Sequence, residues 1–333
     1  MERTAAYLIP GADLGAAVEL ARSAEAWGYE SLWVTHSTTG RDSFLVLSAY
    51  AHATRTIGLG NGVVPIYPRH PVVMAQEALA LAEISGGRFR LGIGVSHRPP
   101  MEGALGLAMG KPIQAMREYV AVLRAALAGQ VEHTGPGYRV SWKTTVLKPP
   151  ARPPVLLAAL SPRMCELAGE IADGAVLWLC PPAYVREVAL PALARGRQKA
   201  GKSLDGFEVV AAVPIALTDR VADTRALFKE ELVRYLQLPF YRAMLTGSGF
   251  GEELAAFDRD RGKAPSPGRA VPDSLAGALG GIGGKSALRD YVAAYRQAGV
   301  TLPAVRPIAF PDSPHYRPTL EACAPELQSS GRR

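Results

Sequence analysis

The sequence has few cysteines, and their spacing excludes two kinds of protein. Only Cys165, Cys180 and Cys323 occur among 333 residues. An odd number of cysteines without a C-x-x-C pair fits neither a disulfide framework nor a cysteine-bound zinc site. We therefore expect buried free thiols in the reducing environment of the cytoplasm.

Long hydrophobic runs are also missing. The apolar run near the N-terminus is too short for a signal peptide, and no segment approaches the roughly 20 apolar residues that span a bilayer. The net charge is +7, but Lys and Arg are scattered among acidic residues, so we expect no nucleic-acid partner. The positive charge suits an anionic small molecule, although solubility alone explains it more simply.

The chain is rich in apolar segments that alternate in period. Hydrophobic residues make up 48% and charged residues 20%, as in a globular protein with a large core. Short apolar runs alternate eight times with amphipathic helical patterns, which favours a single (β/α)8 barrel over a doubly wound sheet. The predicted strands lie at 5–9, 31–35, within 58–71, within 85–97, and at 154–159, 174–179, 207–215 and 302–308.

Two segments interrupt this alternation. Residues 131–149 contain a Gly-Pro-Gly turn between polar extended pieces, which predicts a hairpin. Residues at about 238–284 combine glycines and prolines with one predicted helix near 252–258, and we interpret them as an insertion that could form a lid. We expect one domain over 1–325 and a tail at 326–333.

The third and fourth predicted strands and the helix between them form a βαβ unit with unusual glycines. Gly60 and Gly62 fall where the third strand should be strongest, which is typical of a bulge or of close approach by a flat group. The pattern Gly-Val-x-Pro-x-Tyr-x-Arg-His-Pro at 62–71, followed by Ser-Gly-Gly-Arg-x-x-Leu-Gly-Ile-Gly at 85–94, resembles the bacterial luciferase-like superfamily. Within it, the segments 91–99 and 158–164 resemble the branch that uses the 5-deazaflavin coenzyme F420, not FMN.

Polar residues directly after the apolar runs are the candidates for chemistry, because barrel active sites lie at the C-terminal ends of strands. His36 and His97 occupy such positions, whereas His70 precedes Pro71 at a helix start and is better explained by structure. Many deazaflavin relatives carry an acid before the first of these histidines, but this chain has Thr35 there. The general acid is therefore open, with His97, His36, Tyr67 and Glu102 as candidates.

The turn after the fifth predicted strand could hold a phosphate. Ser161 is placed to cap a helix with Pro162 at its first position, and free N–H groups at a helix start bind anions. An ordinary capped helix would look the same. The resemblance implies that Ser161, Arg163 and Met164 hold the phosphodiester of the coenzyme. It also implies that a non-prolyl cis peptide at Gly62–Val63 supports the deazaflavin ring. The predicted cofactor contacts are Thr35, His36, Gly62, Val63, Val64, Val95, Ser96, Ala159, Leu160, Ser161, Pro162, Arg163, Met164 and Trp178.

Other site types are disfavoured. The strand ends offer no cluster of carboxylates and imidazoles, so we expect no metal. The glycine-rich segments 92–97 and 280–286 lack, respectively, the third glycine of a dinucleotide fingerprint and the first glycine of a Walker A loop.

The resemblance implies a coenzyme F420-dependent oxidoreductase. Such an enzyme moves a hydride between the deazaflavin C5 and an activated C=C, C=N or C=O of a small organic or natural-product substrate. Two alternatives remain: an FMN-dependent luciferase-like monooxygenase, and a non-catalytic flavin-binding barrel. The family also implies a homodimer, and nothing in the sequence suggests a membrane partner.

Overall fold

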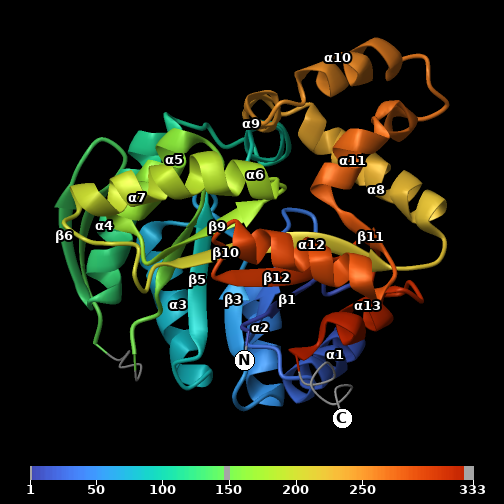
Figure 1. The fold of residues 1–333 in the computed structure, drawn as a ribbon. Coiled ribbons are helices and arrows are strands. Elements are labelled where there is room, and N and C mark those ends of the chain that lie inside the picture. Colours follow the sequence, from blue (N-terminus) through green and yellow to red (C-terminus); the bar gives the residue numbers. More distant parts are fainter. Residues whose placement is uncertain (1, 146–150, 326–333) are drawn as a thin grey trace.

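Eight parallel strands close into a barrel in the computed structural model, which describes residues 2–145 and 151–325. Figure 1 shows the strands surrounded by helices, as the alternation predicted, and the (β/α)8 prediction is confirmed. Closure comes from pairing of the last strand with the first, with Ala5 opposite Ala304. The barrel strands are β1 (Ala5–Leu8), β2 (Ser31–Val34), β3 (Gly58–Asn61) with its continuation β4 (Val64–Pro65), β5 (Phe89–Gly94), β8 (Val155–Ala158), β9 (Gly174–Trp178), β10 (Glu208–Leu217) and β12 (Leu302–Pro307).

Several of the surrounding helices begin after a capping side chain, as predicted for Ser161. Asp13, Asp42 and Ser161 each accept a hydrogen bond from a first-turn N–H of the helix that follows, which satisfies donors that have no intrahelical acceptor. The helices are α1 (Leu14–Ala26), α2 (Ser43–Ala53), α3 (Pro71–Ile84), α4 (Pro112–Leu127), α5 (Pro162–Ile171), α6 (Pro182–Tyr184) with η2 (Val185–Ala189) and α7 (Leu190–Lys199), α8 (Val221–Leu236), α12 (Lys285–Gln297) and α13 (Tyr316–Cys323).

Three excursions leave the barrel pattern. β6 (Gln130–Thr134) and β7 (Arg139–Lys143) form the predicted antiparallel hairpin, although residues 146–150 of that segment lie outside the described residues. η1 (Pro99–Ala104) follows β5. The insertion holds α9 (Pro239–Gly247), α10 (Gly251–Asp260), η3 (Pro267–Ala270), α11 (Asp273–Leu279) and the short strand β11 (Gly281–Gly283), which pairs with β10. Figure 1 shows α9, α10 and α11 as an orange group outside the ring of helices.

The barrel interior is packed with side chains that need glycine on the facing strand. Tyr7 and Trp33 belong to the inner cluster, and a Cβ on Gly60 would lie 2.7 Å from the Trp33 ring. A Cβ on Gly62 would lie 2.5 Å from the Tyr7 hydroxyl oxygen. These glycines on β3 and just beyond it therefore make room for the two aromatic side chains that are buried in the inner cluster.

Four charged residues close the N-terminal end of the barrel. Arg3 bonds Glu30 (2.9 Å) and Glu208 (2.6 Å), and Arg90 pairs with the same two carboxylates at 2.5 and 3.1 Å. Burial alone would raise the pKa of Glu30, but Arg90 and Arg3 lower it. These alternating charges occupy the N-terminal end of the barrel, so the C-terminal end is the one that is available for ligands.

Two neighbouring helices make backbone contact. A Cβ on Gly169 of α5 would lie 2.1 Å from the Leu193 carbonyl oxygen, and one on Gly196 of α7 would lie 1.9 Å from the Glu166 carbonyl oxygen. Each glycine thus packs against the backbone of the other helix. In the part of the chain that the structure describes, no helix is long and apolar enough to cross a membrane.

Candidate functional site

The C-terminal ends of the strands form a polar, partly exposed mouth above the buried interior. Val34, Gly94 and Leu177 near the strand ends are buried, whereas Thr35, Val95 and Trp178, which follow them, have accessible surface. Among the described residues, only Ser96 (φ 61°) and Leu179 (φ 53°) have a positive φ without being glycine. Both follow strands at this mouth, and such backbone conformations cluster at functional sites.

The top of the packed interior is made largely of backbone. The Gly62–Val63 peptide is cis, as the family resemblance implies. Val63 fills the space above the glycines of β5, since a Cβ on Gly92 would lie 3.0 Å from a Val63 methyl and one on Gly94 would lie 2.9 Å from the other. Tyr7 supports Gly62 from within the barrel. This part of the mouth therefore consists of a peptide group and the small side chain of Val63 beside two glycines, which leaves room for a flat ring.

The predicted phosphate turn lies at the same end of the barrel. The Ser161 side chain caps α5 by accepting from the Met164 N–H at 3.3 Å, and Pro162 is the first helical residue. The Arg163 side chain is exposed, and its N–H in the first turn has no intrahelical acceptor. Met164 is buried, so its side chain belongs to the core. The turn therefore offers a helix N-terminus with an adjacent cation, which suits an anion.

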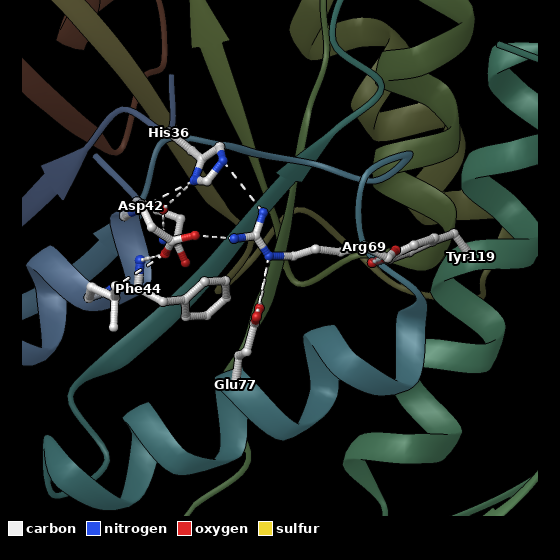
Figure 2. A network of polar contacts seen from close by, with 9 residues as sticks. His36, Asp42, Phe44, Arg69, Glu77 and Tyr119 are labelled. Carbon is white, nitrogen blue, oxygen red and sulfur yellow. Dashed lines mark hydrogen bonds and ion pairs between the residues drawn. The ribbon is translucent and has the colours of Figure 1, made fainter. Parts of the chain in front are cut away.

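His36 lies in a network of charged groups at the end of β2. Figure 2 shows the Arg69 guanidinium between the side chains of His36, Asp42 and Glu77. The distance from Arg69 Nη1 to His36 Nε2 is 3.4 Å. Burial and the charge of Arg69 lower the pKa of His36, while Asp42 opposes the shift. Both effects disfavour the charged imidazole, so His36 is a poor source of a proton.

His97 meets the insertion through a row of aromatic rings. Its ring lies 5.6 Å from that of Tyr241 on α9, which in turn lies 5.0 Å from Tyr235 on α8. Tyr235 contacts Trp178 at the end of β9, with centroids 5.9 Å apart. Burial, then the charge of Arg234, lowers the pKa of His97. The α8–α9 segment thus covers one side of the mouth.

The remaining predicted acids lie beside the 98–110 segment. Burial raises the pKa of Tyr67, while the charge of Arg98 and the Gly110 backbone N–H oppose the shift. Glu102 pairs with Arg98 and accepts from the Met109 N–H at 3.3 Å. Tyr67 is thus a protonated hydroxyl at neutral pH, whereas Glu102 is engaged with its own segment.

His70 has the structural role that its position suggested. It is the N-cap of α3, and its Nδ1 accepts from the Val72 N–H at 3.3 Å. Across residues 2–145 and 151–325, no group of three His, Cys, Asp or Glu side chains could hold a metal ion. The three cysteines are free and buried.

Several residues at the mouth were not found from the sequence. Arg306 on β12 is buried, forms a double ion pair with Glu231 of α8 at 2.7 and 2.8 Å, and lies over the Trp178 ring. A charge within an apolar strand was the available signal for Arg306. Tyr7 could have been found from the alternation of inward-facing residues along β1, whereas Tyr241 lies in an insertion that has no periodic pattern.

Comparison with known proteins adds to this geometry. A family model described as luciferase-like monooxygenase matches residues 1–302. A protein of Mycobacterium tuberculosis, provisionally named a coenzyme F420-dependent oxidoreductase, is 30% identical over 312 residues, covering 85% of this chain and 88% of its own.

Solved structures share the fold. The coenzyme F420-dependent tetrahydromethanopterin reductase of Methanopyrus kandleri has a TM-score of 0.84 and 24% identity, with 99% of each chain covered. The oxygenating constituent of 3,6-diketocamphane monooxygenase from Pseudomonas putida, in complex with FMN, has a TM-score of 0.70 and 17% identity over 98% of each chain. Similar folds therefore occur with both cofactors.

Proposed function

The chain belongs to the luciferase-like monooxygenase family, and within it we propose that this protein is a coenzyme F420-dependent oxidoreductase acting on a small organic molecule. The observation that carries the proposal is the mouth itself, where a floor of backbone and small residues lies at the same end of the barrel as the start of α5. A flat ring with an anionic tail fits these two features. The M. tuberculosis relative favours the deazaflavin over FMN.

The residues present fit such a cofactor. Gly62 and Val63 would lie behind the ring, with Val64 below them and Thr35, His36, Val95 and Ser96 around its edge. The start of α5 would hold the phosphodiester through the turn at 159–164. The Trp178 indole is held at the edge of this site by the Tyr235 ring, 5.9 Å between centroids, and its N–H faces the Tyr235 hydroxyl. When bound, the deazaflavin supplies a hydride at C5 and reacts poorly with oxygen.

The protein's own part is positioning and proton transfer. Tyr67 is the proposed hydrogen-bond donor to the substrate atom that becomes negative, because its hydroxyl is buried, protonated and free of an acceptor in hydrogen-bond geometry. His97 is neutral and can accept a proton when the reaction runs as a dehydrogenation. The 238–284 insertion is the proposed lid, since Tyr241 already contacts His97.

Titration of the purified protein with oxidised coenzyme F420, and separately with FMN, tests the proposal. We expect at least tenfold tighter binding of F420, with quenching of tryptophan fluorescence. The W178F variant should lose most of this quenching, whereas W142F, changed in the outer hairpin, should keep it. Tighter binding of FMN would favour a monooxygenase, and binding without turnover of any carbonyl, imine or enone would favour a non-catalytic barrel. A homodimer and a cytoplasmic location remain predictions.

A further inference from the structure

The His36 imidazole is surrounded by hydrogen-bond donors. The Ser43 backbone N–H points at Nδ1 from 3.3 Å, and an Arg69 guanidinium N–H points at Nε2 from 3.4 Å. The Ser43 hydroxyl oxygen lies 3.2 Å from Nδ1 and accepts from the Asn61 side-chain amide at 2.7 Å. Nδ1 thus has a hydroxyl oxygen nearby that can accept its proton, whereas a proton on Nε2 would point at the guanidinium. The geometry therefore leaves no place for a second proton.

Arg69 is held at this position from three sides. Its guanidinium forms ion pairs with Asp42 and, at 3.0 Å, with Glu77 of α3. The Tyr119 hydroxyl of α4 donates to the Arg69 carbonyl at 3.1 Å, as Figure 2 shows from the right-hand side. The Arg69 side chain is only 14% exposed, so water screens its charge weakly. Two ion pairs and a hydrogen bond to its backbone therefore fix the Arg69 guanidinium beside His36.

We propose that Arg69 is a positioning residue that keeps His36 neutral, with its proton on Nδ1 bonded to the Ser43 hydroxyl and its Nε2 lone pair facing the guanidinium. This tautomer places a lone pair, not an N–H, against the cation, and the Ser43 oxygen can accept from both His36 and Asn61. The histidine at the end of β2 is then a hydrogen-bond acceptor at the working pH, so the proton for the reaction must come from another group.

The charges around His36 predict whether each substitution should raise or lower its pKa. Asp42 approaches from the start of α2 and Arg69 from the loop before α3, and Glu77 acts behind the guanidinium. Removing the cation leaves both carboxylates in place, so the pKa of His36 should rise in R69Q. Replacing Asp42 by Asn removes an anion but keeps an N-cap residue of equal preference, so the pKa should fall further in D42N.

Long-range proton–nitrogen NMR of the histidine rings measures both the tautomer and the titration. The H36Q spectrum assigns the signals of His36 among the six histidines. We expect wild-type His36 to be neutral with the proton on Nδ1 at pH 7, and to titrate at higher pH in R69Q. R117Q, which removes an arginine from the outer α4–α5 ion pair, should leave the titration unchanged.

Two results would overturn the proposal: a wild-type His36 that is doubly protonated at pH 7, or an unchanged titration in both R69Q and D42N. If R69Q does not fold, D42N and R69K decide, since R69K keeps the cation and should leave His36 neutral. The measurement uses the protein without ligand, so its outcome is independent of which cofactor binds.

Discussion

Replacing Gly196 by alanine should destabilise the protein although it improves a helix. Alanine in a helix interior is favoured over glycine by about 1 kcal/mol, which alone predicts stabilisation. The new Cβ, however, would lie 1.9 Å from the Glu166 carbonyl oxygen and 2.8 Å from the Glu170 nitrogen, where real Cβ atoms stay beyond 3.0 Å. Helices α5 and α7 must therefore separate by about 1 Å, because a backbone oxygen cannot rotate away as a side chain does.

The net effect follows from comparing the two contributions. Overpacking of a core typically costs about 1–3 kcal/mol, and a collision with backbone belongs at the upper end. With the helix gain of about 1 kcal/mol subtracted, we expect a net loss of about 2 kcal/mol. In urea this should lower the unfolding midpoint by roughly 0.5–1 M, followed by circular dichroism.

Gly277 provides the matched control. It lies in α11, is exposed, and nothing approaches within 4 Å of its potential Cβ, so G277A should be neutral or raise the midpoint. A midpoint for G196A at or above the wild-type value would refute the reasoning. Since α5 begins at the proposed phosphate turn, G196A should also weaken binding of coenzyme F420, whereas G277A should not.

Three further predictions concern buried charge. Burial raises the pKa of Glu118, but the N–H groups that donate to its carboxylate lower it further than burial raises it. The stabilisation from the charged carboxylate is present above the unfolded pKa and is lost as the pH falls through the folded pKa. E118Q should therefore melt at a lower temperature than wild type at pH 7 but not at pH 3. Arg88 donates to four backbone carbonyls, so R88M should lose about 3 kcal/mol in urea unfolding, whereas R117M on the surface should lose under about 1 kcal/mol. R306M removes the short ion pair of the half-buried Glu231 and leaves it only the longer contact with Arg234 at 3.5 Å, so it should lose about 3 kcal/mol; the double variant with E231M should recover part of it, and a larger loss in the double variant would contradict the pairing.

The barrel could be predicted because each strand carries its own signal. Runs such as 155–158 and 174–178 are apolar on both faces, as expected for parallel strands that are covered by helices outside and packed side chains inside. The helix start at Ser161 followed from local hydrogen-bonding chemistry, and Asp13 and Asp42 cap their helices in the same way. Such features depend on neighbours in sequence and need no knowledge of the fold.

The arrangement of the site depended on distant residues and was less predictable. His36 and His97 were identified by position, but the charged groups that lower their pKa values, Arg69 and Arg234, lie 33 and 137 residues away. Tyr241 belongs to an insertion without apolar periodicity, so its contact with the mouth had no sequence signal. Arg306 interrupts an apolar strand, and only its pairing with Glu231 explains how the charge is tolerated there.

The pairing of β12 with β1 has a consequence for synthesis of the protein. The edge of β1 that pairs with β12 stays unpaired until residues 302–307 have left the ribosome. Translation of the intervening chain at about 5–20 residues per second takes roughly 15–60 s. Throughout that interval an apolar strand edge is open to pairing with other chains. We therefore expect the yield of soluble protein to fall when synthesis is fast and crowded, and to recover with slower expression at low temperature.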